Sequence, residues 1–251
     1  IRMKDTATDV FVTLVYAVFP ELDVITRTVY VENLGESPIK LKKIMSAMLD
    51  FNHYDMDFVH FYGQHILERM KERTALRHGI QSIGSTRGAS SHQHNPFTIL
   101  CDNDATEDFG NCYGFSFVYS GNFTFDVEVD QINQTRAMMG IHPYHFSYEL
   151  KEGDMFEAPE VIMAYSGTGF AKLSHIYHDA FRKNLIRSKY VESPRPILVN
   201  NWEGTYFDFT HEKIVDIAKK AKELGIELLV LDDGWFGKRK DDTTSLGDWF
   251  A

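Results

Sequence analysis

Residues 196–237 decide the fold. They open, at 196–209, with Pro-Ile-Leu-Val-Asn-Asn-Trp-Glu-Gly-Thr-Tyr-Phe-Asp-Phe and close, at 226–237, with Ile-Glu-Leu-Leu-Val-Leu-Asp-Asp-Gly-Trp-Phe-Gly. Each of these segments begins with a short apolar run, at 197–199 and at 226–231, and the residues between the runs have helical spacing. Two strands joined by a helix are expected to be parallel, because parallel strands need such a crossover connection. The stretch therefore predicts the first strand, helix and strand of a (β/α) barrel.

The helix between these two strands is predicted at 211–224. Thr210 is a suitable N-cap residue for it, and Gly225 supplies the left-handed residue that commonly follows the end of a helix. Apolar residues recur at spacings of three and four, which gives the helix one face to pack against the sheet. That face is predicted to consist of Ile214, Ile217, Ala218, Ala221 and Leu224.

Polar and aromatic residues follow both predicted strands at their C-terminal ends. Trp202 follows the first strand, whereas Asp232, Asp233 and Trp235 follow the second. Active sites of (β/α) barrels form at this edge. Carboxylates accept hydrogen bonds from hydroxyl groups and an aromatic ring covers apolar C–H surface, so the set suits a sugar. On these residues alone a second interpretation stays open, in which Asp-Asp-Gly is a plain turn and the tryptophans pack the rim.

The N-terminal part of the chain, residues 1–168, has a different pattern. Short runs rich in Val, Ile, Phe, Tyr and Thr are separated by Gly, Pro, Asn and Asp, which favours an antiparallel β-sandwich. The clearest of these runs are 10–18, 24–33, 113–119 and 123–132. Alternation of apolar and polar residues around 24–33 predicts a strand with one solvent-exposed face.

A change of period near Gly169 predicts an amphipathic helix, because apolar residues from Leu173 onward recur at spacings of three and four. A segment with two prolines and no apolar period follows it. We expect the helix and this linker, together residues 169–195, to connect the sandwich to the barrel segment, residues 196–251. The domain boundary is placed near Arg187.

Charge and composition restrict the kinds of partner. The chain has 251 residues, a net charge of −10 and a pI near 5.5. Binding to nucleic acid or to an anionic membrane is not expected, since both need clustered cations, and no apolar run reaches the length of a membrane span. Cys101 and Cys112 fit neither a metal-binding motif nor a disulfide framework, so we expect reduced thiols in a cytoplasmic protein.

His92 and His94 are spaced so that both imidazoles would lie on one side of a strand, as in some metal sites. No carboxylate or cysteine at matching spacing completes a ligand set, so we predict no metal site. A sandwich loop that faces the barrel, or local hydrogen bonding by Ser90, Ser91 and Asn95, explains the segment better. The two serines also lack the Gly-x-Ser-x-Gly elbow of a serine hydrolase.

Four motifs occur along the chain: Ser85–Phe97 in the sandwich, and Asn200–Phe209, Leu231–Arg239 and Ser245–Trp249 in the barrel segment. Together they resemble the glycoside hydrolase family 36 α-galactosidases, in which a β-sandwich precedes a catalytic (β/α)₈ barrel. The resemblance implies that the chain is an internal fragment, because the family's sandwich begins earlier and its barrel continues through further strands.

The same resemblance implies substrate-binding roles for Trp202, Asp232, Asp233 and Trp235, with the two aspartates holding galactose hydroxyls. It assigns no catalytic residue to this chain, because the family's nucleophile and acid/base are Asp residues on later strands, expected beyond Ala251. It implies no metal and no cofactor.

The implied activity is that of a retaining α-galactosidase, which releases terminal α-galactosyl groups from oligosaccharides such as melibiose or raffinose. The isolated fragment is expected to be inactive, and the parent protein to be homo-oligomeric. A related α-galactosyl transferase or α-N-acetylgalactosaminidase could use the same two strands. An alternative from another class is a non-catalytic sugar-binding module built on the sandwich.

Overall fold

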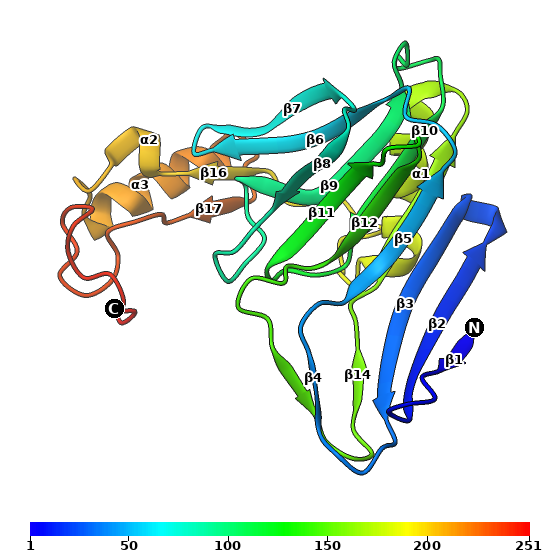
Figure 1. The fold of residues 1–251 in the computed structure, drawn as a ribbon. Coiled ribbons are helices and arrows are strands. Elements are labelled where there is room, and N and C mark those ends of the chain that lie inside the picture. The colour runs from blue at the N-terminus through cyan, green and yellow to red at the C-terminus, as the bar shows by residue number, and fades with distance from the viewer. The chain divides into compact units, whose positions relative to one another are not determined.

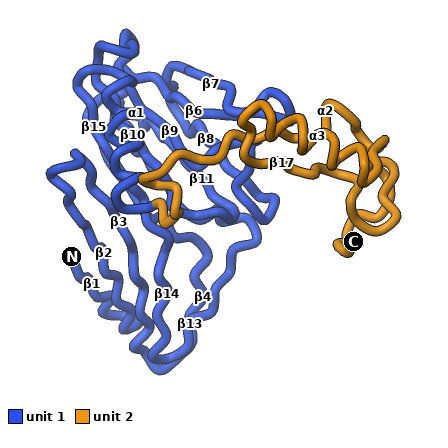
Figure 2. The backbone as a smooth tube through the Cα atoms, turned by 180° about the vertical axis from the view of Figure 1, so that it is seen from behind, with its two compact units in different colours: residues 1–185 blue, residues 186–251 orange.

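The computed structural model describes residues 1–251 and divides into two compact units, Ile1–Leu185 and Ile186–Ala251 (Figure 2). The first unit contains nearly all of the β-structure, and the second contains two short strands and two helices (Figure 1). No helix combines the length and the apolar character that crossing a bilayer requires.

The first unit is built on a nine-stranded antiparallel sheet with the order β1-β2-β3-β15-β10-β9-β6-β7, in which β14 also pairs with β3. Its strands are β1 (Arg2–Lys4), β2 (Val10–Phe19), β3 (Val24–Asn33), β6 (Met56–Gln64), β7 (Leu67–Ala75), β9 (His94–Asp102), β10 (Cys112–Phe117), β14 (Met155–Glu157) and β15 (Val161–Ser166). A single 3₁₀ turn, Pro20–Leu22, joins β2 to β3.

A four-stranded antiparallel sheet with the order β5-β12-β11-β8 packs against this larger sheet. Its strands are β5 (Met45–Phe51), β8 (Gly79–Gly84), β11 (Phe123–Val129) and β12 (Thr135–Ile141). A separate pair is formed by β4 (Ile39–Leu41) and β13 (Tyr148–Leu150). The predicted antiparallel sandwich is therefore confirmed.

Aromatic rings from both sheets form the centre of the sandwich. The Phe125 side chain, on β11, is fully buried, and its ring centroid lies 5.4 Å from that of Phe58 on β6 and 5.3 Å from that of Phe115 on β10. Leu100 and Met139 are also fully buried in this cluster. Burial of large side chains contributed by both layers is what holds the two sheets together.

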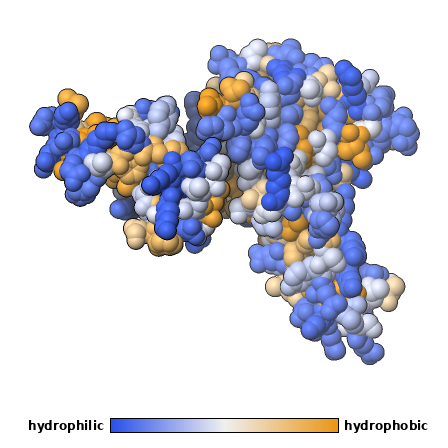
Figure 3. All heavy atoms as spheres, turned by 90° about the vertical axis from the view of Figure 1, so that its left-hand side faces the viewer, coloured by the Kyte–Doolittle hydropathy of each residue, from blue (hydrophilic) through white to orange (hydrophobic).

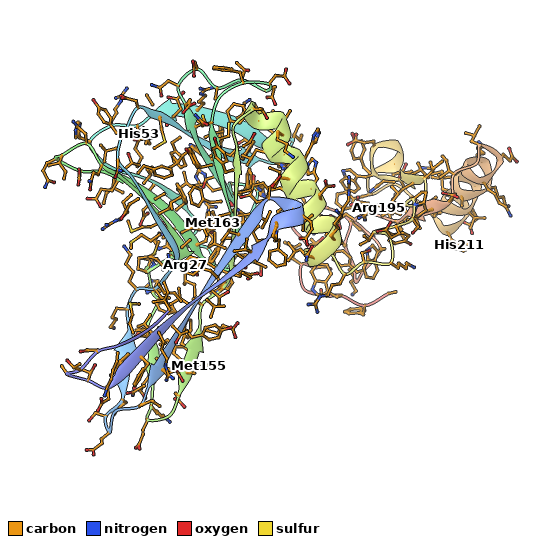
Figure 4. The ribbon with its side chains drawn as sticks, turned by 90° about the vertical axis from the view of Figure 1, so that its right-hand side faces the viewer. Arg27, His53, Met155, Met163, Arg195 and His211 are labelled. Carbon is orange, nitrogen blue, oxygen red and sulfur yellow. The ribbon has the colours of Figure 1, made fainter.

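The expectation of one solvent-exposed face on β3 is only partly correct. Val29 and Val31 belong to the core between the sheets, whereas Val24 belongs to a second core on the other side of the large sheet. Most of both faces is covered, although Ile25 is 43% exposed and Tyr30 and Glu32 are half-buried. Even Arg27 is only 7% exposed, and its Nη1 donates to the carbonyl of Met48 at 3.2 Å. Figure 4 marks Arg27 on β3 and Met163 on the adjacent strand β15.

Helix α1 (Gly169–Ala180) covers that second face, and a π-helical turn at Phe181–Leu185 extends it. The predicted helical period is confirmed, because Leu173, Ile176, Tyr177 and Ala180 are all buried. The Tyr177 hydroxyl donates to the carbonyl of Ile162 on β15 at 3.0 Å. These contacts place the helix within the first unit.

The two cysteines lie opposite each other on β9 and β10 and are both free. Neither Cys101 nor Cys112 is exposed to solvent. Burial raises the pKa of the Cys101 thiol to about 11 and that of the Cys112 thiol to about 12. Both groups therefore stay protonated and unreactive at neutral pH.

The second unit contains the strand, helix and strand that the sequence predicts. β16 (Leu198–Asn200) and β17 (Leu228–Val230) are parallel, and α3 (His211–Glu223) connects them after a short helix, α2 (Trp202–Thr205). Thr210 caps α3 as predicted, since its hydroxyl oxygen accepts a hydrogen bond from the backbone N–H of Lys213 at 3.3 Å. Gly225 follows the helix with φ of 80°.

The predicted buried face of α3 is only partly correct. Ala221 is buried and both Ile214 and Ile217 are half-buried, but Ala218 is exposed and Leu224 is 80% exposed. Leu224 is the C-cap residue, where the backbone leaves helical geometry and the side chain no longer follows the helical stripe.

On the face of the molecule shown in Figure 3, apolar patches lie among mainly hydrophilic side chains.

Phe125→Ala should lower the free energy of unfolding of the first unit by about 3 to 5 kcal/mol, because it leaves a cavity between the sheets. Phe109→Ala is the matched control, since Phe109 is 59% exposed in the same unit. Urea unfolding of both variants measures the difference. Equal losses for the two variants would contradict the two-sheet core.

Candidate functional site

The candidate site is assembled by the pairing of β16 with β17. The register places Asn200 opposite Val230, and the backbone N–H of Asn201 donates to the carbonyl of Val230 at 3.3 Å. Because the strands are parallel, the residues that follow them meet at one edge. Asn200 and Asn201 from the first strand therefore lie beside Asp232 and its neighbour from the second.

Asp232 is held by neutral donors. The amide nitrogen Nδ2 of Asn200 donates to Oδ2 of Asp232 at 2.6 Å, and the backbone N–H of Asp233 donates to Oδ1 at 2.8 Å. The backbone N–H of Asp232 in turn donates to Oδ1 of Asn201 at 2.8 Å. No cation contacts this carboxylate in the structure.

The two asparagines also fix the first strand end. Asn201 is 2% exposed, and its Nδ2 donates to the hydroxyl oxygen of Thr205 at 2.8 Å. Oδ1 of Asn200 accepts a hydrogen bond from the backbone N–H of Trp202 at 2.8 Å. Asn200 therefore links Asp232 to the start of α2 through the two ends of one amide group.

Asp233 lies against a guanidinium group. Arg239 donates to Oδ1 of Asp233 through Nε and to Oδ2 through Nη2, the latter at 2.7 Å. The backbone N–H of Gly234 also donates to Oδ1 at 2.7 Å. Arg239 is only 8% exposed, and its Nη1 donates to the carbonyl of Thr244 at 2.6 Å.

The Asp233–Arg239 ion pair stabilises the ionised form of this carboxylate. The hydrogen bonds from Arg239 hold the pKa of Asp233 below its ordinary value, and the same contact raises the pKa of Arg239. The Arg239 guanidinium carbon also lies 5.7 Å from the ring centroid of Phe207 and 5.5 Å from that of Phe236. Asp233 is thus ionised at neutral pH, which suits an acceptor of hydrogen bonds and not a proton donor.

A shallow hollow of about 470 Å³ lies over these groups. Trp235 and Trp249 are both largely exposed beside it, and each ring packs on Phe236, with centroids 5.2 Å and 4.5 Å away. The hollow is lined by Val230, Leu231, Asp232, Asp233, Trp235, Phe236, Arg239, Leu246 and Trp249. It therefore combines charged acceptors with aromatic surface, as a site for a hydroxyl-bearing ring would.

The structure brings three of the four sequence-predicted site residues together, namely Asp232, Asp233 and Trp235. Trp202 is not among the lining residues, and its ring packs on Tyr206 at 5.3 Å and on Phe207 at 4.9 Å between centroids. The supporting roles of Asn200, Asn201 and Arg239 were missed. All three belong to the quoted motifs, but only the folded loop shows which carboxylate each one contacts.

The Ser85–Phe97 motif forms the loop between β8 and β9 and the start of β9, in the first unit. The prediction of local hydrogen bonding holds for Ser91, which donates to the side-chain oxygen of Gln93, whereas Ser90 donates to the distant carbonyl of Tyr119 at 3.4 Å. Asn95 does not take part, because its buried Oδ1 has no partner. No group of three or more His, Cys, Asp or Glu side chains gathers anywhere in the structure as metal ligands would.

Comparison with known families agrees with this architecture. The sequence model of the glycosyl hydrolase family 36 N-terminal domain matches residues 1–151, and that of melibiase matches residues 155–251. The chain therefore belongs to glycosyl hydrolase family 36, as its motifs predict. The melibiase match begins before β15 and α1, so the two matched segments divide the chain earlier than the two compact units do.

Individual relatives are α-galactosidases. The bifunctional α-galactosidase/sucrose kinase AgaSK of Mediterraneibacter gnavus is 51% identical over 249 residues, with 99% of this chain and 27% of that protein covered. The crystal structure of α-galactosidase AgaA from Geobacillus stearothermophilus superposes with a TM-score of 0.95 at 49% identity, covering 99% of this chain and 34% of that one. Variants of AgaA have been crystallised with raffinose and with stachyose. The chain thus spans about a third of these relatives or less.

Arg239→Gln should raise the pKa of Asp233 toward the ordinary value of about 3.9. The pKa of Asp233 is lower in the folded state than in the unfolded state, so its ionised carboxylate stabilises the fold. This contribution to the free energy of unfolding is present above the unfolded pKa and is lost as pH falls through the lower folded pKa. A ¹³C titration of side-chain carboxyl groups measures the change. Asp50, whose pKa Arg136 lowers in the other unit, is the internal control and should not move.

Proposed function

We propose that this chain forms part of a retaining α-galactosidase that cleaves terminal α-galactosyl groups from oligosaccharides of the raffinose type. The single observation that carries the proposal is the paired carboxylate edge, Asp232 and Asp233, beside exposed tryptophans in a chain of family 36. The substrate class is supported by the relatives that were crystallised with raffinose and stachyose.

In this proposal Asp232 and Asp233 accept hydrogen bonds from galactose hydroxyls. Charged acceptors bind hydroxyl groups more strongly than neutral ones, and a sugar that lacks the matching hydroxyl leaves a carboxylate unpaired. Trp235 supplies an aromatic face against the C–H surface of the ring. Trp202 lies outside the lining of the hollow, and its backbone N–H donates to the same Asn200 amide group that donates to Asp232.

The two aspartates do not themselves perform the bond cleavage in this proposal. A retaining glycosidase needs one carboxylate as the nucleophile and one protonated carboxyl as the acid, about 5 to 5.5 Å apart. Asp233 is kept ionised, so it is poorly suited to act as the acid, and its two hydrogen bonds from Arg239 occupy the oxygens that a nucleophile would need free. The nucleophile and the acid/base are therefore assigned to parts of the enzyme outside residues 1–251.

Residues 1–251 alone should show no turnover of a chromogenic α-galactoside, whereas a full-length protein carrying them should hydrolyse it. The physical reason is that the segment supplies binding groups without the catalytic pair. Turnover by the isolated segment that disappears in Asp232→Asn or Asp233→Asn would make those residues catalytic and would contradict the assignment.

In the full-length protein, Asp232→Asn and Asp233→Asn should each lower kcat/KM by a factor that corresponds to about 2 to 4 kcal/mol, the scale of losing a charged hydrogen bond in a desolvated site. The penalty should shrink for the deoxy-galactoside that lacks the partner hydroxyl. Steady-state kinetics with galactosides and their deoxy derivatives measure both effects. An equal penalty on every substrate would mean that these carboxylates only shape the turn.

A further inference from the structure

The two carboxylates of the site have different numbers of free acceptor positions. A carboxylate offers about four lone-pair positions, two on each oxygen. In Asp232 each oxygen accepts one hydrogen bond, from Asn200 and from the backbone of Asp233. In Asp233, Oδ1 accepts two, from Arg239 and Gly234, and Oδ2 accepts one from Arg239. Asp232 therefore keeps one position on each oxygen, whereas Asp233 keeps one position, on Oδ2.

We propose that Arg239 is a positioning residue that makes Asp233 a single, directed acceptor for one sugar hydroxyl, while Asp232 remains free to accept from two. This inference rests on the proposed function and deepens it, because it divides the recognition of galactose between the two aspartates. Arg239 acts through Asp233 and needs no contact with the sugar.

The geometry around Arg239 supports a fixed orientation. Its planar guanidinium engages both oxygens of Asp233, which fixes the plane of the carboxylate as well as its place. The guanidinium is itself held by the carbonyl of Thr244 and lies near the rings of Phe207 and Phe236. With 8% of its surface exposed, Arg239 cannot move without breaking these contacts.

Arginine is required here for its shape as well as its charge. A lysine would keep a positive charge near Asp233 but could not donate to both oxygens in one plane. Arg239→Lys should therefore retain the ion pair and lose the direction of the free acceptor position. Arg239→Gln removes both features.

The test uses the full-length protein and a set of singly deoxygenated α-galactosides. Asp233→Asn should lose its penalty on one of these substrates, the one without the hydroxyl that Asp233 accepts. Arg239→Gln should lower kcat/KM by about 10- to 100-fold on the complete galactoside, the scale of losing hydrogen bonds to a charged group. Its penalty should vanish on that same deoxy substrate, and Arg239→Lys should show the same pattern with a smaller loss.

A double-mutant cycle completes the test. If Arg239 acts through Asp233, Arg239→Gln should change kcat/KM by less than about threefold when Asp233→Asn is already present. Arg182→Gln is the control, because Arg182 is an exposed residue whose ion pair with Asp179 lies on the surface of the first unit. It should leave the kinetics unchanged.

A merely structural role for Arg239 would give a different result. The fall in kcat/KM caused by Arg239→Gln would then be equal on all deoxy substrates. It would also multiply with the fall caused by Asp233→Asn, and either outcome would overturn the proposal. If the wild-type protein hydrolyses no α-galactoside, the proposed function fails by itself. The role of Arg239 would then be tested by binding, from the dissociation constants of galactose and the deoxy-galactoses for the same variants. Arg239→Gln should weaken the binding of every sugar except the one that lacks the hydroxyl accepted by Asp233, and equal weakening for all sugars would overturn the role.

Discussion

The hydrogen-bonded pairing of β16 with β17 is the interaction on which the candidate site depends. It is a short pairing, of three residues in each strand, yet it sets which side chains meet at the strand ends. Asn201 continues it past the last strand residue, because its backbone donates to Val230 and its side chain accepts from the backbone of Asp232. The burial of Asn201 makes the loss of either bond costly, since a buried amide without partners is strongly unfavourable.

The two adjacent carboxylates at this edge have different hydrogen-bond partners. Here Arg239 compensates the charge of Asp233, while Asp232 receives hydrogen bonds from Asn200 and from the backbone. The two carboxylates are therefore held by different kinds of donor, a guanidinium group at Asp233 and neutral amides at Asp232.

The parts of this architecture that could be predicted from sequence are those with a local, periodic cause. The strands of the sandwich, the cap at Thr210 and the parallel strands around α3 follow from apolar spacing and turn residues. The burial of most of both faces of β3 could not be predicted, because it depends on which layers pack there. The hydrogen-bond partners of Asp233 could not be predicted either, because they depend on the conformation of a loop that contains Gly234 and Gly237, both with positive φ. Trp202 follows its strand as expected, but α2 directs the ring toward Tyr206 and Phe207.

The hollow is open to solvent, which limits how strongly hydrogen bonds to Asp232 and Asp233 can contribute to binding. Trp235 and Trp249 are 44% and 64% exposed, so a sugar hydroxyl that binds beside them, as proposed, would compete with water for the carboxylates. Charged hydrogen bonds gain strength when water is excluded, and they gain specificity when their direction is fixed beforehand. The contacts of Asn200 and Arg239 fix the direction of the carboxylates, but they do not exclude water from them. In the proposed function, the aspartates would therefore select a sugar by the arrangement of its hydroxyl groups more than by exclusion of water.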